Sequence, residues 1–94
     1  MKYKIQRTEH AKMTQGLLRL CMMLPGYFFA PYDSKEDCKN LLETIHKEAL
    51  DTTFLRRNTW EPLNSAYNIQ KADDGIFIES IHGKPYLEFK IVEV

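Results

Sequence analysis

At 94 residues, the chain is long enough for one domain, residues 1–94, and too short for two hydrophobic cores. A hydrophobic fraction of 44% and a charged fraction of 28% are ordinary for a globular protein and exclude a largely disordered chain. The formal net charge is zero, which argues against a protein built mainly to bind the phosphate backbone, because such proteins usually carry a positive excess.

The N-terminal residues predict a strand followed by a helix. Residues 2–7 alternate between polar and apolar side chains, which is typical of a half-buried strand. Thr8 is a candidate N-cap, and after it apolar residues recur at helical spacing until Pro25 interrupts the pattern, so we expect the first helix over about 9–24. Gly16 within this range costs roughly 1 kcal/mol relative to alanine, which indicates either close packing or a later start of the helix.

Four aromatic residues then lie in a short connection that two prolines keep from forming regular structure. The polar backbone of such a connection favours a surface position, and exposed aromatic side chains are enriched at protein interfaces. We therefore predict a loop that contributes to a protein-binding surface. The alternative is that the two phenylalanines fill the core beside a helix end. The four residues are Tyr27, Phe28, Phe29 and Tyr32.

The second helix is expected over about 35–50. Ser34 and Asp37 form a capping-box pattern at its start, and the apolar residues that follow form one stripe. The segment 51–66 has no clear hydrophobic period, so it is either a loop or holds a short strand near Thr53–Arg56.

The last third of the chain predicts three strands, over 67–72, 76–81 and 86–94, separated by two turn-forming sequences. The element order is therefore β-α-α-β-β-β. Two helices cannot cover both faces of a sheet, so we expect an α+β fold with both helices packed on one face of a three- to four-stranded antiparallel sheet. The first strand is expected beside one of the C-terminal strands. The predicted core is Leu17, Leu20, Leu24, Leu41, Leu42, Ile45, Ile69, Ile78, Leu87, Phe89 and Ile91.

No motif in the sequence fixes a catalytic chemistry. There is no nucleophile elbow, phosphate-binding glycine loop or dinucleotide fingerprint, so an enzyme is only the third candidate and no catalytic residue is assigned. The histidines and cysteines lack the short paired spacing of zinc sites, so no metal or other cofactor is expected. Cys38 lies in the first turn of the second helix, where the helix dipole lowers a thiol pKa, but it also lies on the apolar stripe, as a buried small side chain does.

Basic residues provide the second candidate function, nucleic-acid binding. Arg56, Arg57 and Trp60 place two cations and an indole within five residues, which suits phosphate contact and base stacking; the alternative is a solvated loop with the indole on the core. A second basic face combines the first strand and the first helix, although its strand lysines could instead pair with Glu88 of a neighbouring strand. The residues of this second face are Lys2, Lys4, Lys12 and Arg19.

The first twelve residues include Lys2, Tyr3, Lys4, Ile5, Thr8, Ala11 and Lys12. This opening resembles the first strand and helix start of RelE-type ribonuclease toxins. Such toxins are usually basic and carry catalytic arginine, tyrosine or histidine on late strands. Here the net charge is zero, and the late strands offer Tyr86, His82 and Lys90 without an arginine-rich pattern. We therefore assign no family from the resemblance.

The sequence favours a small non-catalytic protein-binding module that acts as a stoichiometric regulator or inhibitor, of the kind found among phage and mobile-element accessory proteins. A small RNA- or DNA-binding protein is the alternative. The expected partner is another protein, and nucleic acid or a second copy of the chain in a homodimer are the other candidates. The two cysteines, the polar start of the sequence and the short apolar stretches predict a cytoplasmic protein with free thiols and no membrane span.

Overall fold

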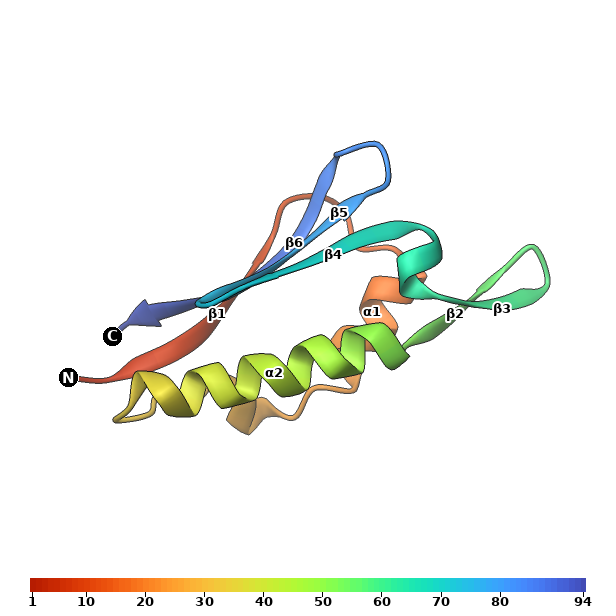
Figure 1. Cartoon of the computed structure of the whole chain (residues 1–94). Coiled ribbons are helices and arrows are strands. Elements are labelled where there is room, and N and C mark those ends of the chain that lie inside the picture. Colours follow the sequence, from red (N-terminus) through yellow and green to blue (C-terminus); the bar gives the residue numbers. More distant parts are fainter.

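The computed structural model describes residues 1–94, which form a four-stranded sheet, two α-helices and a separate two-stranded hairpin (Figure 1). The predicted α+β class is confirmed. The larger sheet has the strand order β1-β6-β5-β4, and each neighbouring pair is antiparallel. Its strands are β1 (Tyr3–Glu9), β4 (Tyr67–Ala72), β5 (Gly75–Ser80) and β6 (Pro85–Glu93).

Strand β1 lies at one edge of this sheet and pairs with β6. The predicted position of the first strand beside a C-terminal strand is therefore confirmed. Ile5 is opposite Ile91, and both side chains are buried. The ladder continues through Thr8 to Glu9, so residues predicted to begin the first helix belong to the strand. Thr8 is therefore not a helix cap, and Thr14, whose backbone is extended, precedes the helix instead.

Helix α1 (Gln15–Met22) is shorter than the helix predicted over 9–24. The helix begins later because β1 continues to Glu9, and the second residue of the helix is the buried Gly16. A Cβ atom on Gly16 would lie 2.9 Å from the Cδ2 atom of Leu63 and 3.1 Å from the Cγ atom of Phe54, closer than side chains normally approach. Both explanations that the sequence offered for this glycine are correct, because the helix starts later and packs closely there.

Helix α2 (Lys35–Asp51) extends along one face of the sheet and contacts all four strands, which confirms the helix predicted over 35–50 (Figure 1). The side chain of Ser34 accepts a hydrogen bond from the backbone nitrogen of Glu36 at 3.1 Å, a cap that contributes about 1 kcal/mol. The helix buries one stripe against the sheet because its apolar residues recur every three or four positions. The buried stripe is Cys38, Leu42, Ile45 and Ala49.

Most of the predicted core is buried, with two exceptions. Leu41 and Ile69 are only half-buried. Ile69 lies on β4, the edge strand farthest from β1, where one side of the strand has no neighbour. Leu41 lies beside the buried stripe of α2 and not on it. Members of the core that the prediction did not include are Ile5, Phe28, Cys38, Ala49, Leu63, Tyr67 and Ile76.

The segment 51–66, which had no predicted structure beyond a short strand, contains a β-hairpin. Its strands are β2 (Thr53–Arg56) and β3 (Thr59–Pro62), and they form a separate antiparallel sheet at one end of the molecule (Figure 1). The turn between them has positive φ angles of 51° at Arg57 and 66° at Asn58, as a two-residue hairpin turn of the primed type requires. With the hairpin, the molecule is 47 Å long and about half as wide.

Candidate functional site

The aromatic connection between the helices contains a short 3-10 helix, η1 (Gly26–Phe29), that fixes where its rings lie. Phe28 is buried in the core, and the ring of Tyr27 packs edge-on against it with centroids 4.9 Å apart while remaining 61% exposed. Phe29 is half-buried and stacks on Phe89 with centroids 6.2 Å apart. Phe28 therefore belongs to the hydrophobic core. Of its two neighbours in η1, Tyr27 has a more exposed ring than Phe29. A protein-binding role for the segment stays a prediction.

The last aromatic residue of the connection joins the outer edge of β1. The backbone nitrogen of Tyr3 donates to the oxygen of Tyr32 at 2.8 Å, and the nitrogen of Tyr32 donates back at 2.7 Å. Next to this bridge, a groove of about 360 Å³ follows the strand edge. It is lined by Lys4, Ile5, Gln6, Arg7 and Phe29.

Helix α1 and the β2–β3 hairpin meet at an arginine–tryptophan contact. The Nε atom of Arg19 donates a hydrogen bond to the backbone oxygen of Thr53 at 3.0 Å. The guanidinium of the same arginine lies over the ring of Trp60, 5.0 Å from its centroid. Trp60 is 57% exposed, so the alternative of a solvated loop whose indole packs on the protein core is wrong. The structure therefore brings together one residue from each of the two predicted basic regions.

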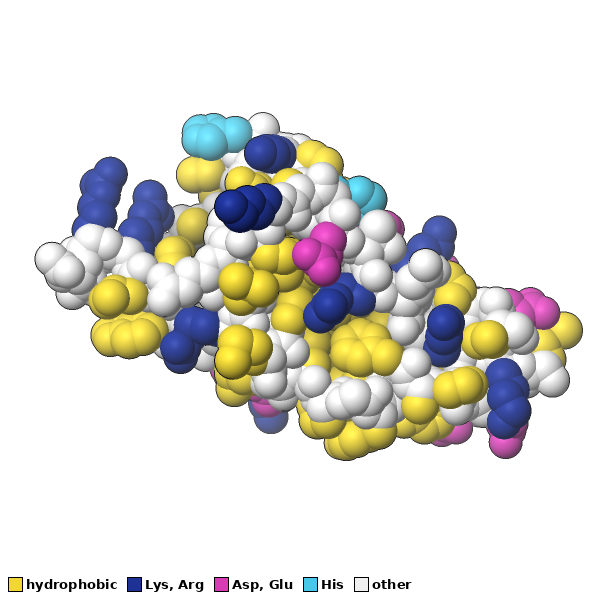
Figure 2. All heavy atoms as spheres, turned by 180° about the vertical axis from the view of Figure 1, so that it is seen from behind, with side chains coloured by type: hydrophobic (Ala, Val, Ile, Leu, Met, Phe, Trp, Pro, Cys, Tyr) yellow, Lys and Arg dark blue, Asp and Glu magenta, His cyan; other side chains and the backbone are white.

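Three exposed apolar side chains lie on the same two elements as this contact. At 3.6 residues per turn, Met22 projects from α1 between Leu18 and Arg19. Leu55 lies directly opposite Trp60 in the hairpin ladder and so on the same face. Figure 2 shows hydrophobic and basic side chains side by side at the hairpin end of the molecule. We call this group the hairpin surface; it comprises Leu18, Arg19, Met22, Leu55 and Trp60.

The remaining predicted nucleic-acid contacts do not gather on one surface. The Nζ atom of Lys2 lies 2.9 Å from Asp33, and this hydrogen bond and charge lower the pKa of the Asp33 carboxyl. The predicted pairing of the strand lysines with Glu88 is wrong, because Glu88 instead contacts His10 at 3.3 Å. Lys4 is opposite the apolar Val92.

The hairpin cations lie far from those of β1. Arg56 is 3.9 Å from Glu61 on the neighbouring strand, which partly neutralises it, and Arg57 occupies the turn. The N-terminus and the hairpin are at opposite ends of the long molecule (Figure 1). Lys12 precedes α1, so the prediction that Lys12 and Arg19 share one helix is wrong. The seven predicted cationic and aromatic residues therefore form at least two separate regions.

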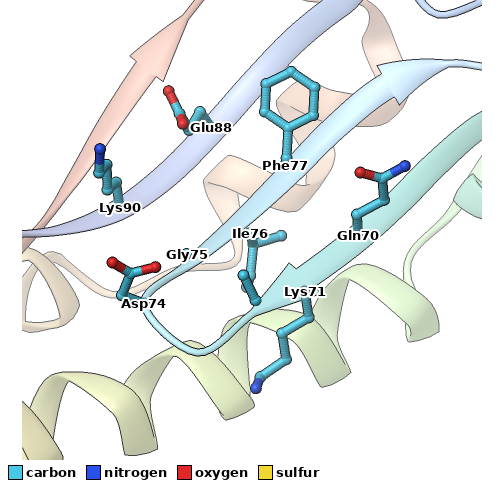
Figure 3. A pocket seen from close by; sticks show the side chains of 9 residues that line it. Gln70, Lys71, Asp74, Gly75, Ile76, Phe77, Glu88 and Lys90 are labelled. Carbon is cyan, nitrogen blue, oxygen red and sulfur yellow. The ribbon is translucent and has the colours of Figure 1, made fainter.

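The face of the sheet opposite α2 carries a second hollow, of about 390 Å³, at the β4–β5 turn. Phe77, Glu88 and Lys90 project to the same side of the sheet there, whereas Lys71 points toward α2 (Figure 3). Lys71 forms an ion pair with Glu43 of that helix at 2.6 Å. The charges around the hollow are mixed, and no buried side-chain polar atom lacks a hydrogen-bond partner, so the hollow shows no preference for one ligand chemistry.

The two cysteines are free thiols in different surroundings. Cys38 is fully buried, as expected for a small side chain on the apolar stripe; burial raises the pKa of its thiol, and the neighbouring Asp37 raises it further. Burial also raises the pKa of Cys21, against the opposing hydrogen bond and charge of Arg7. Neither thiol belongs to a group of three or more potential metal ligands. No helix combines the length and apolar character needed to cross a membrane.

No protein-family model, curated protein or solved structure matches the chain. The functional argument therefore rests on the residues and contacts described above.

Proposed function

We propose that this chain is a small non-catalytic protein-binding module and that it binds its partner through the hairpin surface. The observation that carries the proposal is a group of large exposed apolar side chains around an arginine that the fold already holds in place. Met22 is 84% exposed and Trp60 is 57% exposed. Tryptophan, methionine and arginine are enriched at protein interfaces, and tryptophan and arginine dominate their binding energy.

Preorganisation of Arg19 supports this assignment. Its Nε–H group is bonded to Thr53 and its plane lies over Trp60, so both side chains have lost rotamer freedom before a partner arrives. Ordering a flexible side chain at an interface costs roughly 0.5–1.5 kcal/mol, which a preorganised pair largely avoids. A guanidinium has five N–H donors, and the bond to Thr53 uses one of them. The surface thus offers apolar contact around hydrogen-bond donors for a partner's carboxylate or carbonyl.

The same geometry favours protein over nucleic acid as the partner. Base stacking needs a free aromatic face, and Arg19 covers one face of Trp60, so at most the other face of the indole is left for a base. Apart from Arg19, the hairpin surface is uncharged, because Leu18, Met22 and Leu55 offer no charge to phosphate. Neutral apolar neighbours are typical of an interface centre and not of a phosphate-binding groove.

The test is capture of a partner from native-host lysate by the tagged chain, followed by reconstitution with the purified partner. We expect a 1:1 complex by light scattering, as a stoichiometric regulator requires. The double variant Met22→Ser/Trp60→Ser should bind at least tenfold more weakly with an unchanged melting temperature. Ile81→Ser is the matched control, because Ile81 is also an exposed apolar residue, at 53%, but lies outside the hairpin surface.

Two outcomes would overturn the proposal. Equal loss of binding in the Ile81→Ser control and in the double variant would show that the hairpin surface has no special role. Binding that disappears after nuclease treatment, weakens steeply with salt and is lost in Arg56→Ala/Arg57→Ala would support a nucleic-acid partner instead.

A further inference from the structure

We propose that the free outer edge of β1 is a second binding site, at which an extended segment of another protein adds to the sheet as a strand. The segment pairs its backbone with Ile5 and Arg7 and carries an acidic side chain. This site uses none of the residues of the hairpin surface, so it goes beyond the function proposed above.

The hydrogen-bond alternation of β1 identifies the free groups. In an antiparallel ladder, every second residue bonds to a given neighbouring strand. The nitrogen of Val94 donates to the oxygen of Lys2 at 2.8 Å, and the nitrogen of His10 donates to the oxygen of Tyr86 at 2.9 Å. Even-numbered residues of β1 therefore bond to β6, and odd-numbered residues direct their N–H and C=O groups outward. The two bonds between Tyr3 and Tyr32 on the outer side agree with this alternation.

The connection between the helices pairs with this edge at one residue, Tyr32, and does not continue as a fifth strand. In the register set by Tyr3 and Tyr32, Ala30 would be opposite Ile5. The nitrogen of Ala30 instead donates to the oxygen of Tyr27 at 3.2 Å, because η1 turns the chain away. Ile5 and Arg7 are thus left without a backbone partner on the outer side. Such an edge is a template for an extended chain.

The groove beside this edge specifies the side chains of the added strand. Ile5 and Arg7 share the helix-side face of β1, where Phe29 also packs, whereas Lys4 and Gln6 face the opposite side. The residue that pairs with Ile5 would therefore lie near the ring of Phe29, and the residue two positions away would lie near Arg7. Because a strand in the antiparallel register of Tyr32 runs against β1, an acidic residue at position i and an apolar residue at position i+2 fit Arg7 and Ile5.

Charge favours an acidic partner over a second copy of the chain. No carboxylate lies within 4.0 Å of Lys4, and the contact of Arg7 with Glu9 is long, at 3.7 Å, and exposed. Exposed ion pairs of this kind contribute little, so Arg7 can exchange Glu9 for a partner's carboxylate. Two copies joined through Ile5 and Arg7 of β1 would pair Arg7 either with Arg7, where like charges are unfavourable, or with Ile5; neither register places a carboxylate of the other copy opposite Arg7.

The test uses two capped synthetic peptides, TTETVTT and TTKTVTT, titrated to millimolar concentration against the ¹⁵N-labelled chain. We expect TTETVTT to shift the amide resonances of Ile5 and Arg7 and to slow their hydrogen exchange. TTKTVTT should bind about fivefold more weakly, because it replaces an opposite charge with a like charge. Trp60→Ser should bind both peptides as the wild type does, which separates this site from the hairpin surface.

Two variants of one residue distinguish backbone pairing from charge. Arg7→Pro removes an outward N–H group but no bond to β6, a substitution that edge strands tolerate, and it should abolish binding of both peptides. Arg7→Gln keeps the N–H group and should bind both peptides with equal affinity. If Arg7→Pro does not fold, the Arg7→Gln comparison still decides the role of charge. Shifts confined to other residues, equal binding of the two peptides to the wild type, or a dimer with protected Ile5 and Arg7 amides would each overturn the proposal.

Discussion

The sheet and the hairpin are stabilised in different ways. In the sheet, side chains such as Leu42 and Phe89 are completely buried between α2 and the strands. The hairpin has only two strands, and an isolated two-stranded hairpin is marginally stable in water. It is attached through buried Leu63, half-buried Phe54 and the hydrogen bond from Arg19. The comparison indicates that most of the folding free energy lies in the sheet, whereas the most exposed aromatic and methionine side chains of the proposed interface lie at the less stable end.

The largest effect is expected from Phe89→Ala, which removes a fully buried ring from the sheet. Creating such a cavity costs about 3–5 kcal/mol, a large part of the stability of a small domain. Urea denaturation followed by circular dichroism measures the change. Leu18→Ala is the matched control at the hairpin end, where the side chain is exposed, and it should change stability by less than about 0.5 kcal/mol. Similar costs for both variants would mean that the two regions do not differ as described.

The sequence predicted the sheet region well because its elements have strong periodicity. The stripe of α2 and the alternation of β6 each repeat over many residues, and both predictions are confirmed apart from Leu41, which is half-buried. The start of α1 was predicted too early, because pairing with β6 extends β1 to Glu9, and a single-sequence pattern does not report that pairing. The hairpin was missed because its turn is formed by Arg57 and Asn58 and not by a residue pair that favours positive φ at both positions.

The candidate site was predicted only in part. The sequence identified Arg19 and Trp60 as separate candidates, but their contact depends on tertiary structure, since Arg19 bonds to a residue 34 positions away. The apolar neighbours Leu18, Met22 and Leu55 were not singled out, because each lies in a segment where a buried position was equally compatible with the pattern. The signal available in the sequence was the position of these apolar residues near the ends of short elements, where a side chain is less often buried.

The junction between the two regions can be disturbed by Gly16→Val. The added methyl groups would collide with Leu63 and Phe54, which attach the hairpin, and overpacking of this kind costs about 1–3 kcal/mol. We expect faster amide exchange in β2 and β3 and a smaller change in β5 and β6, measured by native-state hydrogen exchange. Gly26→Val is the control, because no atom lies within 4 Å of a Cβ atom built there. Faster exchange throughout the sheet would show that the junction belongs to the main core.

The smallest expected effect is a gain in stability at the hairpin turn. Arg57 and Asn58 both have positive φ angles, which arginine adopts at a cost, whereas Asn-Gly is the pair that such turns favour. Arg57→Asn/Asn58→Gly should therefore stabilise the hairpin by about 1 kcal/mol, because it relieves the cost of an arginine in the left-handed region. Gly83→Ala provides the opposite control in the β5–β6 turn. Gly83 has a φ of 90° with open space around it, so this variant should lose stability through backbone strain alone.

If the hairpin opens independently, the double variant slows amide exchange in β2 and β3 and leaves the melting temperature of the sheet nearly unchanged. An equal increase in protection throughout β5 and β6 would show that the two regions unfold as one unit and would contradict the difference in stability between them.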